Sequence, residues 1–220
     1  MRLVKKLLAG MLRQLVVGAV VLAAATVLLG LAYPTVTWGI SRLGASKAEG
    51  SVLTDARGCP AGSELVGVDL KVPPGAPDPY LHSRVAGTGD DPLASGDPSA
   101  SAASNLGPNN PELHRLIAAR RAHIAAREGV PPAQVPADAV TGSASGLDPH
   151  ISPEYAAIQV PRIARATGSS QARVREVIAR HTQGRQWGFL GEPRVNVLRV
   201  NLALGHTVGT CRHAGDQPRR

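Results

Sequence analysis

The strongest constraint on this chain is an apolar run without a charge near its N-terminus, residues 15–33 (LVVGAVVLAAATVLLGLAY). In a helix, at about 1.5 Å per residue, this run approaches the roughly 30 Å thickness of the hydrocarbon core of a bilayer. Charged side chains stop at Arg13, and Tyr33 and Trp38 lie at the far end, where aromatic residues favour the membrane interface. We therefore predict a transmembrane helix over residues 15–37.

A cleavable secretory signal is the alternative interpretation, because its apolar core also follows basic residues. That core is typically about 7–15 residues long and ends at a small-x-small cleavage site. Here the run is longer, and the Ala-x-Ala pattern of residues 23–25 lies inside it, which favours an uncleaved anchor. The basic residues before the helix place residues 1–14 in the cytoplasm and residues 38–220 outside the cell membrane.

The outer part, residues 38–220, is predicted to be one small mixed α/β domain of the α+β class. Aromatic residues make up 3% of the chain, so the core must be aliphatic. Residues 86–111 are rich in Gly, Ser, Asp, Asn and Pro and are predicted to form a long loop. The net charge of +8 is spread along the chain and few aromatic side chains can stack on bases, so nucleic acid is not an expected partner.

Capping residues indicate three helices in this outer domain. The first two begin with Asn or Ser as the N-cap, continue with a first-turn proline, and end at a glycine. The third begins after Ser169 or Ser170, with apolar residues at helical spacing. These signals predict helices over residues 110–129, over residues 152–168, and from residue 170 onward.

Alternation of apolar residues indicates strands. Residues 194–204 (RVNVLRVNLAL) alternate in two phases, which predicts a strand interrupted by a bulge or a bend. Residues 63–70 (SELVGVDL) are a plausible partner strand.

The stretch of residues 141–155 (TGSASGLDPHISPEY) has the composition of either a catalytic loop or a tight turn. The nucleophile elbow G-x-S-x-G requires a central serine, but Ala144 occupies that position. No phosphate-binding G-x-x-x-x-G-K-[ST] motif occurs, and the histidines are too scattered to indicate a metal site. We therefore interpret this stretch as an elaborate turn and possible docking surface. Cys59 and Cys211 could form one disulfide or stay as thiols.

Several long segments resemble a known family. These are residues 135–166 (VPADAVTGSASGLDPHISPEYAAIQVPRIARA), residues 188–204 (GFLGEPRVNVLRVNLAL) and residues 104–111 (SNLGPNNP), in the same order as in the family and after a basic start and a single anchor. They resemble the C subunit, KdpC, of the bacterial Kdp potassium-transporting ATPase.

The resemblance implies a non-catalytic accessory subunit of a high-affinity, ATP-driven potassium import complex. Its implied partners are a channel-like potassium-binding subunit, a P-type ATPase subunit and a small hydrophobic subunit, beside the lipid bilayer of the cell membrane. ATP and K⁺ would act through the complex, and no cofactor, metal or catalytic residue of its own is implied. Members are described as catalytic chaperones that raise the affinity of the ATPase subunit for ATP.

The resemblance also implies roles for particular residues. Ser145, Gly146 and Gln159 match a signature that has been compared with nucleotide contacts. The remaining motif residues are implied to serve partner docking or structure: Asn105, Gly107, Pro108, Gly146, Leu147, Asp148, Pro149, Ser152, Gly191, Asn196 and Asn201.

The expected topology argues against direct contact with ATP. The ATP site of a P-type pump is cytoplasmic, whereas the expected orientation places Ser145 and Gln159 across about 30 Å of hydrocarbon from it. An effect on ATP affinity would then be a coupling between distant sites. Two alternatives stay open at this point: a membrane-anchored extracytoplasmic hydrolase and a stand-alone binding module.

Overall fold

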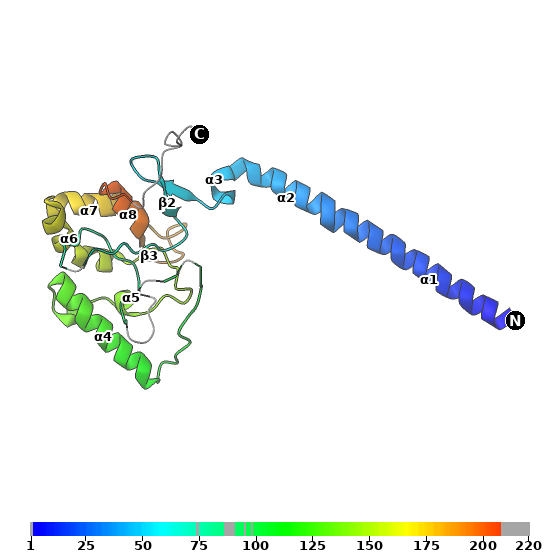
Figure 1. The fold of residues 1–220 in the computed structure, drawn as a ribbon, viewed down its shortest axis with the longest axis horizontal. Coiled ribbons are helices and arrows are strands. Elements are labelled where there is room, and N and C mark those ends of the chain that lie inside the picture. Colours follow the sequence, from blue (N-terminus) through cyan, green and yellow to red (C-terminus); the bar gives the residue numbers. More distant parts are fainter. Residues whose placement is uncertain (1, 74, 86–90, 95, 98, 208–220) are drawn as a thin grey trace, which may run out of the picture. The chain divides into compact units, whose positions relative to one another are not determined.

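The computed structural model describes residues 2–73, 75–85, 91–94, 96–97 and 99–207, and these residues form two compact units, Met1–Gly50 and Ser51–Arg220 (Figure 1). Together they combine helices with small antiparallel sheets, as predicted for the α+β class. Cys59 is buried and disulfide-bonded, whereas Cys211 lies outside the described residues.

The first unit is a continuous helical stretch. It consists of α1 (Arg2–Val27), the π-helical turn η1 (Leu28–Ala32), α2 (Tyr33–Ser41), the 3-10 turn η2 (Arg42–Gly44) and α3 (Ala45–Ala48). Within the part of the chain that the structure describes, Leu8–Ala48 is the one helix long and apolar enough to cross a membrane, and its apolar side chains are exposed. Exposed apolar side chains along such a length distinguish this helix from the core helix of a soluble domain.

The π-helical turn has a local cause. Pro34 has no backbone N–H to donate, so a regular helix would lose a hydrogen bond at the preceding turn. Tyr33 N–H instead donates to Leu28 O, five residues back, and the helix register shifts just before the proline. The hydroxyl groups of Thr26 and Thr35 donate to Leu22 O and Leu31 O, so these polar groups are satisfied within the helix.

The second unit contains the three helices that the caps predicted (Figure 1). They are α4 (Pro111–Glu128), α6 (Pro153–Thr167) and α7 (Gln171–Arg180), with N-cap side chains Asn110, Ser152 and Ser170 accepting from backbone N–H groups of the first turn. Gly129 and Gly168 end the first two in the left-handed conformation, with φ of 68° and 66°. Short elements η3 (Pro132–Gln134) and α5 (Ala137–Val140) follow α4.

The strand predictions need correction. The structure has a two-stranded sheet of β1 (Val52–Thr54) and β2 (Pro60–Ser63) and a three-stranded sheet in the order β3 (His150–Ile151), β5 (Arg194–Asn196) and β4 (Thr182–Gln183). All pairings are antiparallel. Residues 64–70 are turns and irregular chain, so the predicted strand over residues 63–70 is wrong beyond its first residue.

The predicted strand over residues 194–204 is also wrong after residue 196. The chain turns there into the helix α8 (Val197–Ala203), and the Asn196 side chain caps it by accepting from Arg199 N at 3.0 Å. The change of phase in the apolar alternation marks the point where the strand ends and the helix begins. The buried side chains of α8 have the spacing of one helical face: they are those of Val197, Leu198, Val200 and Asn201.

The core lies between these helices and the three-stranded sheet and is aliphatic, with Tyr155 as its buried aromatic side chain among the described residues. An extended segment, residues 78–84 (DPYLHSR), runs through it, and we call this segment the strap. Leu81 and His82 of the strap are 0% and 7% exposed. Residues 91–94, 96–97 and 99–110 of the predicted long loop contain no helix and only an isolated bridge; residues 86–90, 95 and 98 of that loop lie outside the described residues.

Candidate functional site

The Ser-Gly turn, residues 141–149, is held by its own short polar side chains. The Ser143 hydroxyl lies 3.2 Å from the Ser145 hydroxyl and accepts from Asp148 N at 3.3 Å, while Ser145 Oγ accepts from Leu147 N at 3.1 Å. Gly146 has φ of 72°, a conformation that glycine adopts without strain. The sequence therefore forms a compact, self-bonded turn, as its composition predicted.

Neighbouring segments converge on this turn. Gly67 N donates to Leu147 O at 2.8 Å, Val197 N donates to Pro149 O at 3.0 Å, and Ser143 N donates to Val85 O at 3.1 Å. Gly67 approaches so closely that a Cβ placed on it would lie 2.6 Å from the Asp148 carbonyl oxygen. The turn thus bonds to the residue after the strap, to the segment that follows β2 and to the first residue of α8.

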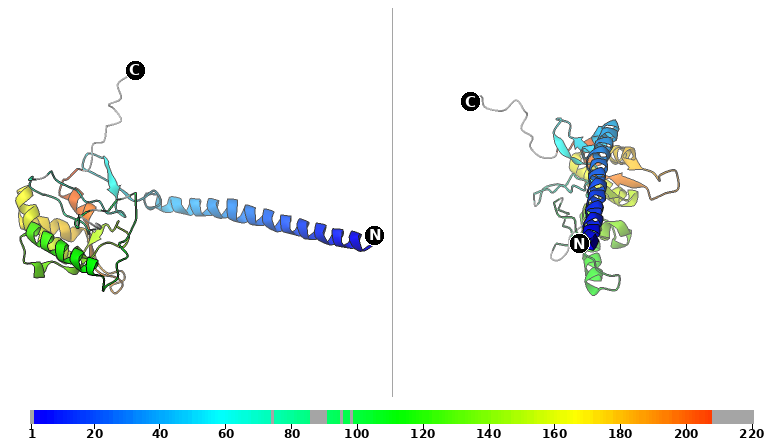
Figure 2. Two further views of the ribbon diagram at one scale, coloured as in Figure 1. Left: turned by 60° about the horizontal axis from the view of Figure 1, so that its bottom comes forward. Right: turned by 90° about the vertical axis from the view of Figure 1, so that its right-hand side faces the viewer.

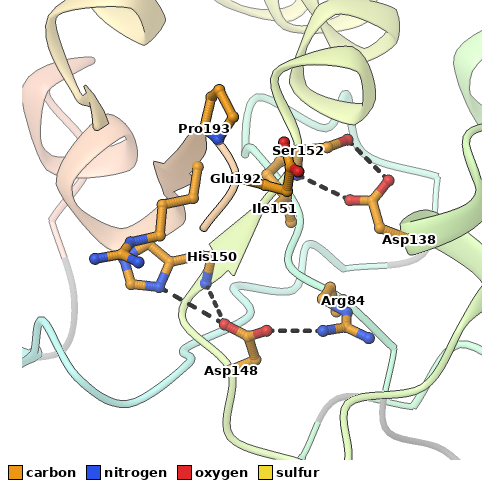
Figure 3. Close-up of a pocket in the computed structure, with 9 residues that line it drawn as sticks. Arg84, Asp138, Asp148, His150, Ile151, Ser152, Glu192 and Pro193 are labelled. Carbon is orange, nitrogen blue, oxygen red and sulfur yellow. Dashed lines mark hydrogen bonds and ion pairs between the residues drawn. The ribbon is translucent and has the colours of Figure 1, made fainter. Parts of the chain in front are cut away.

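Arg84 fixes the turn from the strap side (Figure 3). Its Nη1 donates to Asp148 Oδ2 at 2.8 Å, and its Nη2 donates to the carbonyl oxygens of Thr141 and Gly142 at 3.2 and 3.1 Å. Its Nε is buried without a hydrogen-bond partner among the described residues. Burial alone would raise the pKa of Asp148, but hydrogen bonds from His150 and Arg84 outweigh it and lower the pKa to about 2.

Three hollows surround the turn. One of about 480 Å³ has polar and charged walls that include Arg84, Asp148 and Glu192 (Figure 3), and a second of about 570 Å³ is lined by the turn itself together with Leu65 and Val66. The third, of about 320 Å³, lies between the turn, the loop around Asn105 and the start of α4. The turn is therefore a ridge between concave surfaces, a shape suited to docking a partner.

The strap beneath the turn is held by side chains instead of by a neighbouring strand. Gln159 Oε1 accepts from His82 N at 2.8 Å and its Nε2 donates to His82 O at 3.2 Å. Asn201 does the same for Leu81, accepting from its N at 2.8 Å and donating to its O at 2.9 Å. Both amide side chains are 0% exposed. Each carboxamide thus replaces the paired backbone that a β-sheet would supply.

His82 lies between two carboxylates. Its Nδ1 is 3.0 Å from Asp69 Oδ1 and its Nε2 is 2.6 Å from Asp78 Oδ2. Burial alone would lower the pKa of His82, but the hydrogen bonds to Asp69 and Asp78 outweigh it and raise the pKa. Burial also opposes ionisation of Asp78, yet the hydrogen bond with His82 and the charge of Arg162 lower its pKa to about 2. The arrangement is a buried carboxylate–imidazolium–carboxylate cluster.

The cluster continues into α4 and α6. Arg162 Nε donates to Glu128 Oε2 at 2.9 Å, and its Nη1 donates to the carbonyl oxygens of Asp78 and Tyr80 in the strap at 2.8 and 3.0 Å. The Glu128 side chain is 0% exposed. A buried carboxylate of this kind needs a paired cation, and here the pairing also fixes the strap.

Of the residues with a suggested nucleotide role, Ser145 and Gly146 lie together in the turn, whereas Gln159 lies in the core. Ser145 is exposed, but the buried amide of Gln159 is bonded to His82 and to Arg162, whose Nη2 donates to Oε1 at 3.0 Å. The structure therefore does not bring these three side chains to one surface.

The residues suggested for docking also fall into two groups, one at the surface and one inside the domain. Asn105, Gly107 and Pro108 are exposed, and Leu147, Asp148 and Pro149 line the hollow next to Leu65. Gly191 lies in the loop between β4 and β5, with φ of 75°. The others act inside the domain: Ser152 caps α6, Asn196 caps α8 and donates to Glu64 O at 2.8 Å, and Asn201 holds the strap.

Sequence reasoning missed the buried ionic cluster. One signal was available, because Glu128 follows Ile124 by four residues and so falls on the buried face of α4, where a charged residue needs a partner. No comparable pattern in the sequence marks His82, Asp69 and Asp78 as buried. Within the described residues, no group of three or more His, Cys, Asp or Glu side chains is arranged to hold a metal ion.

Among the described residues, one apolar helix long enough to cross a membrane is followed by an α+β body, which defines the class of proteins with a single candidate membrane span and one folded domain. The family profile described as "KdpC: K+-transporting ATPase, c chain" matches residues 15–206. The chain therefore belongs to the KdpC family, an accessory component of a potassium-transporting ATPase of several subunits.

Curated relatives agree with this assignment. A "Potassium-transporting ATPase KdpC subunit" from Kineococcus radiotolerans is 46% identical over 197 residues, which cover 90% of this chain and 95% of the relative. Proteins of the same name from Geobacter sulfurreducens and Koribacter versatilis are 45% and 39% identical, over 81% and 90% of this chain and 90% and 96% of their own lengths.

Proposed function

We propose that this chain is the membrane-anchored, non-catalytic subunit that stabilises a high-affinity, ATP-driven potassium import complex. The observation that carries the proposal is the family match over residues 15–206, because it includes both the apolar helix and the body. Its partners are a channel-like potassium-binding subunit, a P-type ATPase subunit and a small hydrophobic subunit. Potassium and ATP are bound by those partners.

The body of the protein lies on the extracytoplasmic side of the cell membrane in this proposal. Basic residues precede the apolar helix, which favours a cytoplasmic N-terminus. The disulfide at Cys59 supports the same orientation, since disulfides persist in oxidising compartments and are rare in the cytosol.

An effect on ATP affinity is then indirect. Gln159, one of the three residues compared with nucleotide contacts, has its amide bonded inside the core, which supports a route that does not involve direct binding. If this subunit binds one conformation of the ATPase subunit better than another, it changes ATP affinity by the ratio of those two affinities. The Ser-Gly turn and its hollows are the surface that we assign to this contact.

Deletion of this chain tests the proposal. We expect the remaining subunits to separate during purification in mild detergent, and high-affinity potassium uptake to be lost when potassium is scarce. Restoring the full chain from a second plasmid should recover both. A complex of normal composition and normal uptake without this chain would show that the proposal is wrong.

Cysteine labelling tests the orientation. Ala102→Cys, in the exposed part of the long loop, should react with a membrane-impermeant thiol reagent in intact cells. The control Arg2→Cys, at the N-terminus, should react only after lysis. The opposite pattern would place the body in the cytoplasm and would revive direct contact with ATP.

A further inference from the structure

The loop between β4 and β5 exposes an unusual group of apolar side chains, and we call residues 185–192 the hairpin tip. Trp187, Phe189 and Leu190 are 84%, 68% and 43% exposed. The loop extends from the rest of the second unit in the right-hand view of Figure 2. Aromatic residues make up only 3% of the chain, so two of them on one tip are a considerable share of its aromatic surface.

The hairpin tip is rigid. Gln186 N donates to Leu190 O at 2.8 Å and Leu190 N donates back to Gln186 O at 2.9 Å, while Phe189 N donates to Gln186 O at 3.2 Å. Arg185 Nη2 pairs with Glu192 Oε2 at 2.6 Å across the base. Because the loop is already ordered by these bonds, little conformational entropy remains to be lost when it binds.

The backbone of the tip holds the tryptophan in a conformation that favours glycine. Trp187 has φ of 52°, and Gly188 and Gly191 follow with φ of 82° and 75°. A large side chain is rare in this region and is disfavoured there. The side chain of Trp187 is almost fully exposed, and the ring that it meets is that of Phe189 on the same tip, at a centroid distance of 6.4 Å, so the core gains nothing from it. Such strain at an exposed aromatic residue points to a binding role.

We propose that the hairpin tip is an anchor that inserts into an apolar socket on another subunit of the same complex, on the side of the membrane where this body lies. This inference rests on the proposed function. The anchor has the composition of an interface centre: Trp187 and Phe189 are flanked in the sequence by Arg185 and Glu192, which pair with each other. The socket is therefore apolar inside, with groups of both charge signs at its rim.

The size of the tip favours a partner subunit over a second copy of this chain. Two aromatic side chains bury about 150–250 Å² each. Their sum is below the roughly 800 Å² per partner that a stable interface needs, so the tip alone does not hold a dimer. A subunit already kept nearby by the shared membrane supplies the rest of the contact, since tethering makes a second contact effectively intramolecular.

The charges around the tip argue against a lipid surface as the occupant. Glu192 is 77% exposed at the side chain, and the hollow that it lines carries the carboxylates of Asp138 and Asp148 beside the guanidinium groups of Arg84 and Arg194. Loops that bind anionic membranes combine aromatic residues with an excess of basic ones, whereas here three carboxylates face two guanidinium groups. A protein socket with mixed charges accommodates both Arg185 and Glu192.

Trp187→Gly tests the anchor without disturbing the loop, because glycine adopts the same φ without strain. The purified full-length variant competes with labelled wild-type chain for assembly with the separately purified partner subunits in mild detergent. We expect the apparent Kd of the variant to rise by about 10- to 30-fold, the size of an aromatic hot spot. Val52→Ala, at a position 56% exposed in β1, is the matched control and should bind as the wild type does. Circular dichroism establishes that both variants are folded.

A photoreactive benzoylphenylalanine in place of Trp187 identifies the occupant. In the purified, reconstituted complex we expect an adduct with another subunit, and none when the group replaces Val52. An adduct with lipid or with a second copy of this chain, or unchanged affinity of Trp187→Gly, would overturn the proposal. These results are distinct from failure of the proposed function, in which the wild-type chain itself does not join the complex.

Discussion

The two buried amides that hold the strap provide the sharpest test of the fold. Gln159→Met keeps the volume of the side chain but removes the bonds to His82 N and O, and Asn201→Leu does the same at Leu81. Each substitution leaves one buried N–H and one buried carbonyl of the strap without the amide partner, and Gln159→Met also removes the Oε1 acceptor of Arg162 Nη2, which adds to the loss counted for the strap. At about 1–3 kcal/mol for each orphaned group, the expected loss is about 2–6 kcal/mol per variant.

This loss is large against the total stability of an ordinary domain, which is about 5–15 kcal/mol. A volume-conserving change of apolar packing would by itself cost less than about 1.5 kcal/mol, so the two effects can be separated. The free energy of unfolding is measured by urea titration of the full chain in mild detergent, followed by circular dichroism. Gln171→Met, on the exposed start of α7, is the control and should change stability by no more than about 0.5 kcal/mol.

The reasoning fails if both core variants lose less than about 1 kcal/mol with an unchanged denaturant slope. That result would mean that water or a rearranged backbone satisfies the strap as well as the amides do. The double variant should lose less than the sum of the two single losses, because the amides hold adjacent residues of one segment.

Two further predictions concern the turn and the ionic cluster. Gly67→Ala places a Cβ against the Asp148 carbonyl, so it should lower the melting temperature and weaken assembly. The control Gly107→Ala, whose Cβ meets nothing within 4 Å, should change neither measurement. Equal behaviour of the two variants would exclude the close approach as the cause. The pKa of His82 is raised in the folded protein, so its charged form stabilises the fold. This contribution is complete below the unfolded pKa of about 6.5 and is lost as the pH rises through the folded pKa. Unfolding of His82→Gln should therefore depend less on pH above about 6.5 than unfolding of the wild type, and parallel pH profiles would contradict the role of the imidazolium.

Local signals were enough to place most helices from the sequence. Asn110, Ser152 and Ser170 each cap a helix that the structure contains, and Gly129 and Gly168 end two of them. The caps succeed because they satisfy backbone groups within a few residues, so the physics is local. The helix that is apolar and long enough to cross a membrane was predictable for the same reason, since length and absence of charge are properties of a single segment.

The sequence-based predictions failed where a local pattern had two interpretations, or where the two residues of a contact lie far apart in the sequence. Val195 and Val197 suit a strand, but Asn196 between them is also a strong N-cap, and burial of Leu198 and Asn201 on one helical face decided for the helix. The contacts of the strap join residues 77 and 120 positions apart, at Gln159 and Asn201. Such pairs have no periodicity from which they could be inferred.

The amide side chains that hold the strap come from residues synthesised much later than the strap, and this fixes the order in which the domain can fold. Leu81 emerges from the ribosome, and on the proposed topology crosses the membrane, long before Asn201 has been synthesised. Until α8 has been delivered, Leu81 lacks the Asn201 amide and the strap can be held at His82 by Gln159 alone, so the strap completes its bonds only after residue 201 has followed. A nascent chain that stalls before α8 is therefore a substrate for proteases and chaperones, and incorporation into a complex becomes a checkpoint on complete synthesis.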